Sequence, residues 1–232
     1  MQDEVTKHTK KIYKVVKDPK HTFLEKVKEI IIEIFIIVFA VTLSIWLHNW
    51  SEQKHHQEET IDFLLDLEDD LNKDIKWMEK EKTRLTKTVE QYSILKNLTE
   101  KQIDSIEAVK AHIDMQINYV IRKTNTGNYE GFKSSGKIGF IENKKLKNLI
   151  LEYYQESMPS LEEAEKFYNS RLNKIEELAY HNREKKKLLL DPIFKISLDL
   201  VIQSATNDDK GYDENIAQAK EIITEIDKET KE

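Results

Sequence analysis

Three histidines near residue 50 form the one local cluster of side chains in this sequence that could bind a metal ion. His48, His55 and His56 lie close to Glu52 and Glu59, and imidazole and carboxylate groups are common ligands of zinc and copper. In a helix, however, neighbouring residues such as His55 and His56 point about 100 degrees apart. We therefore interpret these side chains as polar groups at a membrane interface, and we predict no metal site.

A glycine-rich segment at residues 131–137 matches the start of a phosphate-binding loop. Its sequence, GFKSSGK, has the required glycine and lysine spacing, but Ile138 occupies the position of the serine or threonine that binds Mg²⁺. No apolar strand precedes the segment, although such loops follow a strand. We therefore predict no nucleotide site, and we interpret residues 125–142 as a corner between helices where glycine supplies a positive φ.

Two charged segments are weaker candidates for binding sites. The sequence NDDKGYDEN, residues 207–215, is shorter than a calcium-binding EF-hand loop and lacks its ligand spacing, so it predicts an exposed turn. The basic residues of the segment 183–187 suit a solvated helix end, and Glu184 lies among them. A nucleic-acid ligand needs more positive charge than this acidic domain offers, so we predict no nucleic-acid partner.

The chain also lacks the residue patterns of common enzyme classes. It contains no cysteine, which excludes disulfides, thiolate metal sites and a cysteine nucleophile. It has no Ser-His-Asp order, nucleophile elbow or glycosidase-like carboxylate pair that stands out. The sequence therefore predicts a protein that is not an enzyme, with no catalytic residue and no cofactor.

One apolar stretch, from Ile30 to Trp50, dominates the organisation of the chain. A membrane-spanning helix needs about 20 mostly apolar residues, and Ile30–Leu47 carries a single charge, Glu33. Residues 1–29 hold eight lysines against five acidic residues, and positive charge beside a span stays in the cytoplasm. We predict a basic cytoplasmic tail at 1–29, a signal anchor at 30–50 in the inner (cytoplasmic) membrane, and a periplasmic domain at 51–232.

A cleaved signal peptide is the alternative to an anchor, because it also joins a charged start to an apolar run. This run is too long for a signal peptide, and the sequence WLHNW at its end offers no small-residue cleavage site. Trp46 and Trp50 are instead the aromatic interfacial anchors expected at the outer surface of a membrane. These features favour an uncleaved, single-pass anchor in the lipid bilayer.

Five residues of the span fall on one side of a helix: Glu33, Ile37, Ala40, Ser44 and His48. Ala40 and Ser44 form a small-xxx-small pair, which lets two spans approach closely. An acidic side chain on such a face points more often at protein than at lipid. We predict an interaction face for a protein partner or a second copy of the chain. The alternative is that Glu33 snorkels to the cytoplasmic boundary or is protonated there.

Apolar residues recur at helical spacing through the rest of the chain. A heptad of Leu64, Leu71, Met78, Leu85 and Tyr92 predicts a coiled-coil-like long helix at 51–98, and no breaker separates it from the span. The second seam that we assign, at 61, 68, 75, 82, 89 and 96, is apolar only half of the time, which indicates packing within the chain. The predicted fold is all-α: a single N-terminal transmembrane helix that continues into an elongated antiparallel helical bundle.

Capping signals place the remaining helices. Thr99 with Gln102, and Ser160 with Glu163, fit capping boxes, Asp191-Pro192 fits an N-cap and first helical residue, and Asp213 is expected to cap the last helix. The predicted helices are 102–121, 143–157, 160–187, 192–205 and 213–229.

Several of these elements together resemble an uncharacterised domain-of-unknown-function family of short single-pass membrane proteins common in Bacteroidota. They are Glu33-Ile34, Asn49-Trp50-Ser51-Glu52, the acidic helix IDFLLDLEDDLNKDI, Asn128-Tyr129-Glu130, Ser134–Lys137, Leu146 and Tyr153-Tyr154. The sequence departs from the pattern at Ile32, where glycine is expected, and at His48, where asparagine is usual. The resemblance covers most of residues 25–160, and it implies an inner-membrane anchor with a helical periplasmic domain and no known activity.

Two functions fit this sequence. The first is a membrane-anchored interaction or scaffold protein, whose partners are the lipid bilayer and a protein or second copy. The second is a periplasmic ligand-sensing or regulatory domain that acts through the transmembrane helix and a cytoplasmic partner. A pocket lined by convergent polar groups favours sensing, whereas a solid core with an exposed apolar strip favours scaffolding.

Overall fold

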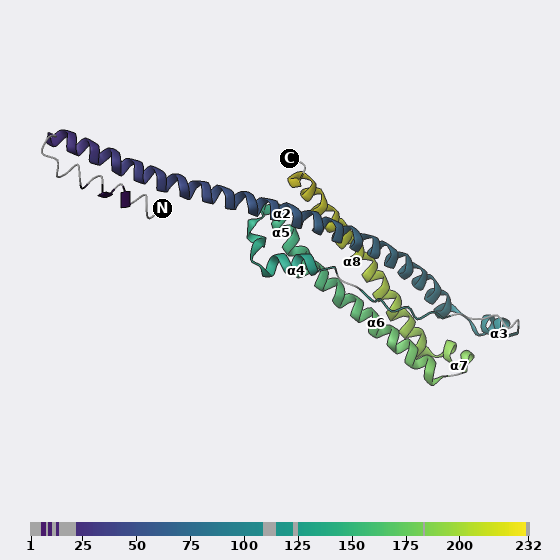
Figure 1. The fold of residues 1–232 in the computed structure, drawn as a ribbon. Coiled ribbons are helices and arrows are strands. Elements are labelled where there is room, and N and C mark those ends of the chain that lie inside the picture. The colour runs from purple at the N-terminus through teal and green to yellow at the C-terminus, as the bar shows by residue number, and fades with distance from the viewer. Residues whose placement is uncertain are drawn as a thin grey trace. The chain divides into compact units, whose positions relative to one another are not determined.

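The structure of the protein is a computed structural model. It describes residues 22–108, 115–122, 125–182 and 184–230, with five further positions between 6 and 13. Most of the predicted tail, 1–29, therefore lies outside the described residues. The predicted helical class is confirmed, because every element in the described ranges is a helix and none is a strand (Figure 1). The chain divides into two compact units, Met1–Glu59 and Thr60–Glu232.

The described part of the first unit is dominated by helix α2, which extends from Phe23 to Asn97 and continues into the second unit. Its apolar stretch is long enough to cross a membrane by length and composition, as predicted. Most of the large side chains of this stretch are exposed, among them Phe35 at 66% and Trp46 at 61%. Exposure on this scale differs from a helix of a soluble core, where such side chains are buried.

Three long helices form the core of the second unit: α2 from Thr60 onward, α6 (Met158–His181) and α8 (Pro192–Thr230). They lie alongside one another in Figure 1. Ion pairs from Lys82 to Asp213 and from Lys96 to Asp199 join α2 to α8. The shorter elements are α3 (Glu100–Ala108), α4 (Gly127–Ser134), the 3₁₀ helix η1 (Lys137–Phe140), α5 (Lys144–Glu152), the π-helical turn η2 (Tyr153–Ser157) and α7 (Lys185–Leu190).

The heptad in α2 is confirmed as a buried seam, but the second seam is one position away from the predicted one. All five predicted heptad residues are 2% exposed or less: Leu64, Leu71, Met78, Leu85 and Tyr92. The buried partners of this seam are Thr60, Leu67, Asp74, Glu81, Thr88 and Leu95. Of the predicted second seam, Ile75 is buried as well, whereas Ile61 is 39% exposed. Both registers alternate steps of three and four residues. One buried polar residue of the observed register has a partner in another segment, because the Asn125 amide donates to Asp74 at 2.8 Å.

The predicted helix 102–121 is wrong in its second half. Its start is right, since the Thr99 and Gln102 side chains each accept the other residue's backbone N–H, which forms the predicted capping box before α3. Residues 109–114 lie outside the described ranges, and 115–122 are not helical. Side chains hold this segment extended: Asn169 accepts from the Val120 N–H and donates to the Val120 carbonyl, both at 2.8 Å.

The predicted corner at 125–142 is partly helical. It contains α4 and η1, and the turn between them lies at Gly136, whose φ of 76° confirms the positive φ expected of a glycine there. Asn143 caps α5 by accepting from the Leu146 N–H at 3.1 Å. The predicted break between 157 and 160 is absent, because η2 joins α5 to α6 and the Ser160 capping box therefore does not form.

Beyond residue 160, the observed helix boundaries differ from the predicted ones in two places. The predicted helix 160–187 ends instead at His181, and α7 begins after it at Lys185. The predicted helices 192–205 and 213–229 are one continuous helix, α8, which Asp191 caps as expected by accepting from the Ile193 N–H at 2.8 Å. The exposed turn predicted at 207–215 and the Asp213 cap are therefore wrong.

Gly211 explains why the turn signal in α8 is misleading. A Cβ atom at this position would lie 3.0 Å from Leu161 Cδ1 in α6. The glycine therefore allows the two helices to approach closely rather than the chain to turn. Asp208, Tyr212 and Asn215, within the same segment, are all at most 6% exposed and belong to the interior of the second unit.

Candidate functional site

The five residues of the predicted span face all lie in α2, at steps that place them on one side of the helix. Glu33 is 5% exposed in the first unit, Ile37 is half-buried, and Ala40, Ser44 and His48 are exposed. The Ser44 hydroxyl donates to the Ala40 carbonyl at 2.8 Å, which satisfies it within the helix. The shared face is thus helical as expected, and its role in association stays a prediction.

Among the residues that the structure describes, the three histidines lie along α2, and part of the glycine-rich segment is helical. His48 lies 4.0 Å from Glu52 and His55 lies 3.5 Å from Glu59, both along the same helix. Within the described ranges no group of three His, Asp or Glu side chains converges as a metal site would require. Gly131 to Ser134 belongs to α4, so this part of the segment is helix rather than a loop around a phosphate.

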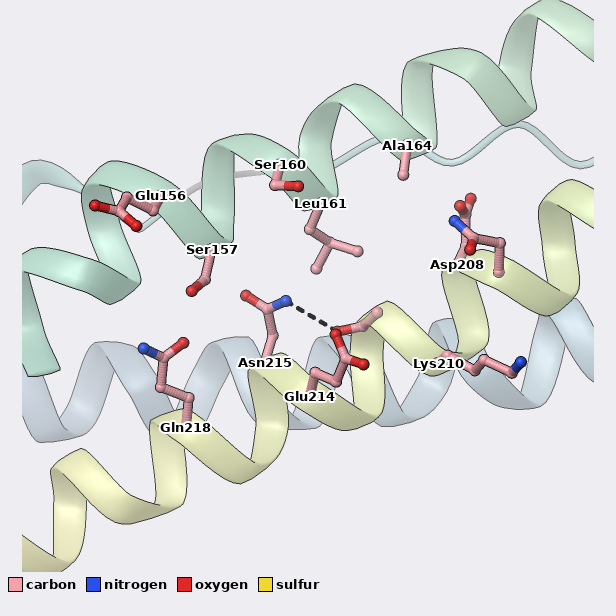
Figure 2. A pocket seen from close by; sticks show the side chains of 12 residues that line it. Glu156, Ser157, Ser160, Leu161, Ala164, Asp208, Lys210, Glu214, Asn215 and Gln218 are labelled. Atoms are coloured by element: carbon pink, nitrogen blue, oxygen red, sulfur yellow. Dashed lines mark hydrogen bonds between the residues drawn. The ribbon is translucent and has the colours of Figure 1, made fainter.

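A groove between α6 and α8, with a volume of about 450 Å³, is a candidate site that the sequence did not suggest. Figure 2 shows side chains of both helices along it. From the α6 side come Glu156, Ser157, Ser160, Leu161 and Ala164, and from α8 come Asn207, Asp208, Lys210, Gly211, Glu214, Asn215 and Gln218. Small residues at 160, 164 and 211 leave this space between two helices that are otherwise closely packed.

Asp208 is the most unusual residue of the groove. It is 1% exposed, and its Oδ2 atom has no hydrogen-bond partner. Burial, reinforced by the nearby Glu165 carboxylate, raises the pKa of Asp208 to about 7 from an ordinary value of 3.8. A buried carboxyl group without a partner is destabilising in its charged form. The residue therefore has an unsatisfied acceptor and titrates near neutral pH.

Asn215 provides a second unsatisfied acceptor two helical turns along α8. Its Nδ2 donates to the Gly211 carbonyl at 2.9 Å, whereas its Oδ1 has no partner and the residue is 6% exposed (Figure 2). Leu161 of α6 contacts the helix between these two positions, at Gly211. The groove thus combines two polar acceptors with an apolar contact between them.

A buried ion pair, whose Glu165 carboxylate interacts electrostatically with Asp208, fixes the extended segment 115–122 to the core. Arg122 donates to Glu165 through Nε, at 3.1 and 3.2 Å, and through Nη2 at 2.8 Å, and both side chains are at most 7% exposed. The Tyr212 hydroxyl donates to Glu165 at 2.8 Å, and the Arg122 guanidinium lies 4.7 Å from the centre of the Trp77 ring. This network joins all three long helices to the segment.

The sequence contains one signal that could have located the groove. Asp208, Tyr212 and Asn215 are spaced four and three residues apart, in phase with the apolar residues Val201, Ala205, Ala219 and Ile222 of the same helix. The cluster of Asn, Asp and Gly residues obscured this period, because those types are typical of turns. The Arg122–Glu165 pair carries no comparable signal, since the two residues are distant in the sequence.

A second surface feature lies on the same pair of helices. Phe167, Ile193 and Ile196 are each 54 to 60% exposed. A hollow of about 200 Å³ beside Phe167 shares Ala164, Asn207 and Asp208 with the groove. The second unit therefore shows both a polar groove and exposed apolar side chains.

Comparison with known proteins supplies a family but no activity. A family model described as a family of unknown function, DUF6090, matches residues 33–191, which is more than half of the chain and includes most of the apolar stretch, the extended segment and α6. No curated protein and no solved structure matches the chain. On the extent of that match, the chain belongs to DUF6090, a family of unknown function.

Proposed function

We propose that the chain is a non-enzymatic, membrane-anchored interaction protein, which residues 30–50 hold in the inner membrane and whose helical bundle lies in the periplasm. The exposed apolar surface of α2 carries this proposal. Phe35, Phe39 and Trp46 on this surface are 58 to 66% exposed. Apolar surface on this scale is expected to contact lipid or protein, because in water it is unfavourable.

The orientation in the proposal follows from charge. Lysines precede the apolar stretch, and acidic residues outnumber basic ones in the rest of the chain. The interaction partner that we propose for the span is a second copy of the chain. Ala40 and Ser44 are exposed and small, so two α2 helices can approach closely along this face.

Replacing Ala40 by leucine tests the self-association. Because a large side chain at this exposed position keeps two α2 backbones apart, we expect the substitution to reduce the cross-linked dimer by at least about threefold in isolated membranes. Thr42→Leu is the matched control, because it places the same side chain in the span but on the opposite side of the helix from Ala40. A dimer yield that is equal in both variants and the wild type would rule out the face as an interface.

A specific observation favours a second candidate function, a periplasmic ligand-binding domain that signals through α2. The groove between α6 and α8 is lined by polar groups, and two of them, Asp208 and Asn215, have unsatisfied acceptor atoms. Sensing needs such a binding site, whereas a scaffold does not. The two functions are compatible, since a ligand could act on a protein that also self-associates.

A further inference from the structure

We infer that the groove between α6 and α8 binds an aliphatic diamine, with one ammonium group at Asp208 and the other at Asn215. This inference rests on the second candidate function and specifies its ligand. It starts from the unsatisfied acceptors Oδ2 of Asp208 and Oδ1 of Asn215, each in a side chain that is more than nine-tenths buried.

The charge of the groove favours a cation. Glu156, Asp208 and Glu214 line it, and Lys210, which is exposed, is the one basic residue among its lining side chains. Three carboxyl groups against one ammonium group repel anions and attract cations. An ammonium group would also give Asp208 the charged hydrogen-bond partner that it lacks. Binding requires the Asp208 carboxylate and the Asn215 amide oxygen, which are both buried, to turn toward the groove.

The shape of the groove favours an organic diamine over a metal ion. Seven residues separate Asp208 from Asn215, which corresponds to about 10 Å along a helix. A single metal ion cannot bridge this distance, and no described group of three His, Asp or Glu side chains converges there. Two ammonium groups joined by a short methylene chain can bridge it, because Leu161 and Gly211 provide an apolar surface between the two acceptors.

The raised pKa of Asp208 agrees with this assignment. A carboxyl group that is half protonated at about pH 7 without a ligand is fully ionised when an ammonium group binds beside it, because an opposite charge favours the charged form. Burying the charged Asp208 carboxylate costs free energy, and its ion pair with the bound ammonium group offsets this cost.

The test is isothermal titration calorimetry of putrescine into the full-length chain in detergent micelles at 0.15 M salt. We expect saturable binding to the wild type, binding of butylamine that is at least tenfold weaker, and no binding of the uncharged diol of the same length. Asp208→Asn and Asn215→Leu should each weaken putrescine binding at least tenfold. Asp208→Asn keeps the shape of the side chain, and circular dichroism checks that both variants retain the helical fold.

Glu163→Gln is the matched control, because it removes one exposed carboxylate from α6 outside the groove and should leave the affinity unchanged. Absence of putrescine binding to the wild type, or equal affinity in the wild type and Asp208→Asn, would overturn the inference. If Glu163→Gln weakens putrescine binding as much as Asp208→Asn does, the binding is attraction to the net negative charge of the protein. That result would also overturn the inference. Dimer cross-linking through α2 is measured separately, so that failure of the diamine site leaves the anchoring proposal to its own test.

Discussion

Replacing Arg122 by methionine is expected to lower the free energy of unfolding by about 3 to 5 kcal/mol, because it leaves the buried Glu165 carboxylate without its ionic partner. Glu165 is 4% exposed and accepts hydrogen bonds from Arg122 and from Tyr212. Only the tyrosine hydroxyl would remain after the substitution. Urea denaturation of the full-length chain in micelles, followed by circular dichroism, measures the change.

Two further variants separate the stability that is lost with the ion pair from the general effect of a substitution. Lys174→Ala removes an ion pair with Glu177 on α6 whose side chains are 50% and 55% exposed, and it should change stability by less than about 1 kcal/mol. The double variant Arg122→Met with Glu165→Met should recover most of the lost stability, since no unpaired charge remains. If Arg122→Met costs no more than Lys174→Ala, the segment 115–122 is not held by this pair.

Asp208→Asn is expected to act in the opposite direction and to stabilise the chain at pH 8. The folded state raises the pKa of Asp208 from 3.8 to about 7, so the folded protein binds this proton more tightly than the unfolded chain does. The stability that the proton provides is complete below pH 3.8 and is lost between pH 3.8 and about 7. The side chain of the Asp208→Asn variant stays neutral and avoids this loss of stability, which by linkage amounts to at most about 4 kcal/mol.

The neighbours of Asp208 do not obscure this pH dependence. Burial raises the pKa of Tyr168 to about 12 and raises that of Tyr212 as well, so both stay protonated throughout the window. Melting temperatures of wild type and Asp208→Asn, measured between pH 4 and 8, should diverge as the pH rises, while Glu163→Gln should follow the wild type. Parallel curves for wild type and Asp208→Asn would show that Asp208 is not buried in its charged form.

The sequence correctly predicts the features that depend on a local pattern of residues. The heptad at Leu64, Leu71 and Met78 correctly predicts a buried face of α2, because apolar residues that repeat every seven positions lie on one side of a helix. The predicted caps at Thr99 and Asp191 are also confirmed, since a capping side chain bonds only to residues close to it in the sequence. The apolar stretch of α2 is the third such feature.

Features that depend on distant residues could not be predicted in this way. Val120 has an apolar helical pattern around it, but Asn169 binds its backbone and keeps the segment extended. The residues around Gly211 predict a turn, whereas the role of this glycine depends on Leu161 in another helix. The groove needs α6 as well as α8, so its space could not be predicted from the sequence, although the spacing of Asp208 and Asn215 places both on one side of α8.

The central claim is that residues 30–50 anchor the chain in the inner membrane with the bundle on the periplasmic side. A reporter enzyme that is active only outside the cytoplasm, fused after Glu232, tests it most directly. We expect an active reporter that remains with the membrane fraction after alkaline extraction, and an inactive one when the same reporter is fused before Met1. An inactive reporter after Glu232, together with activity of a cytosolic reporter at the same position, would contradict the orientation. Active reporter released into the soluble fraction would contradict the anchor and identify residues 30–50 as a cleaved signal peptide.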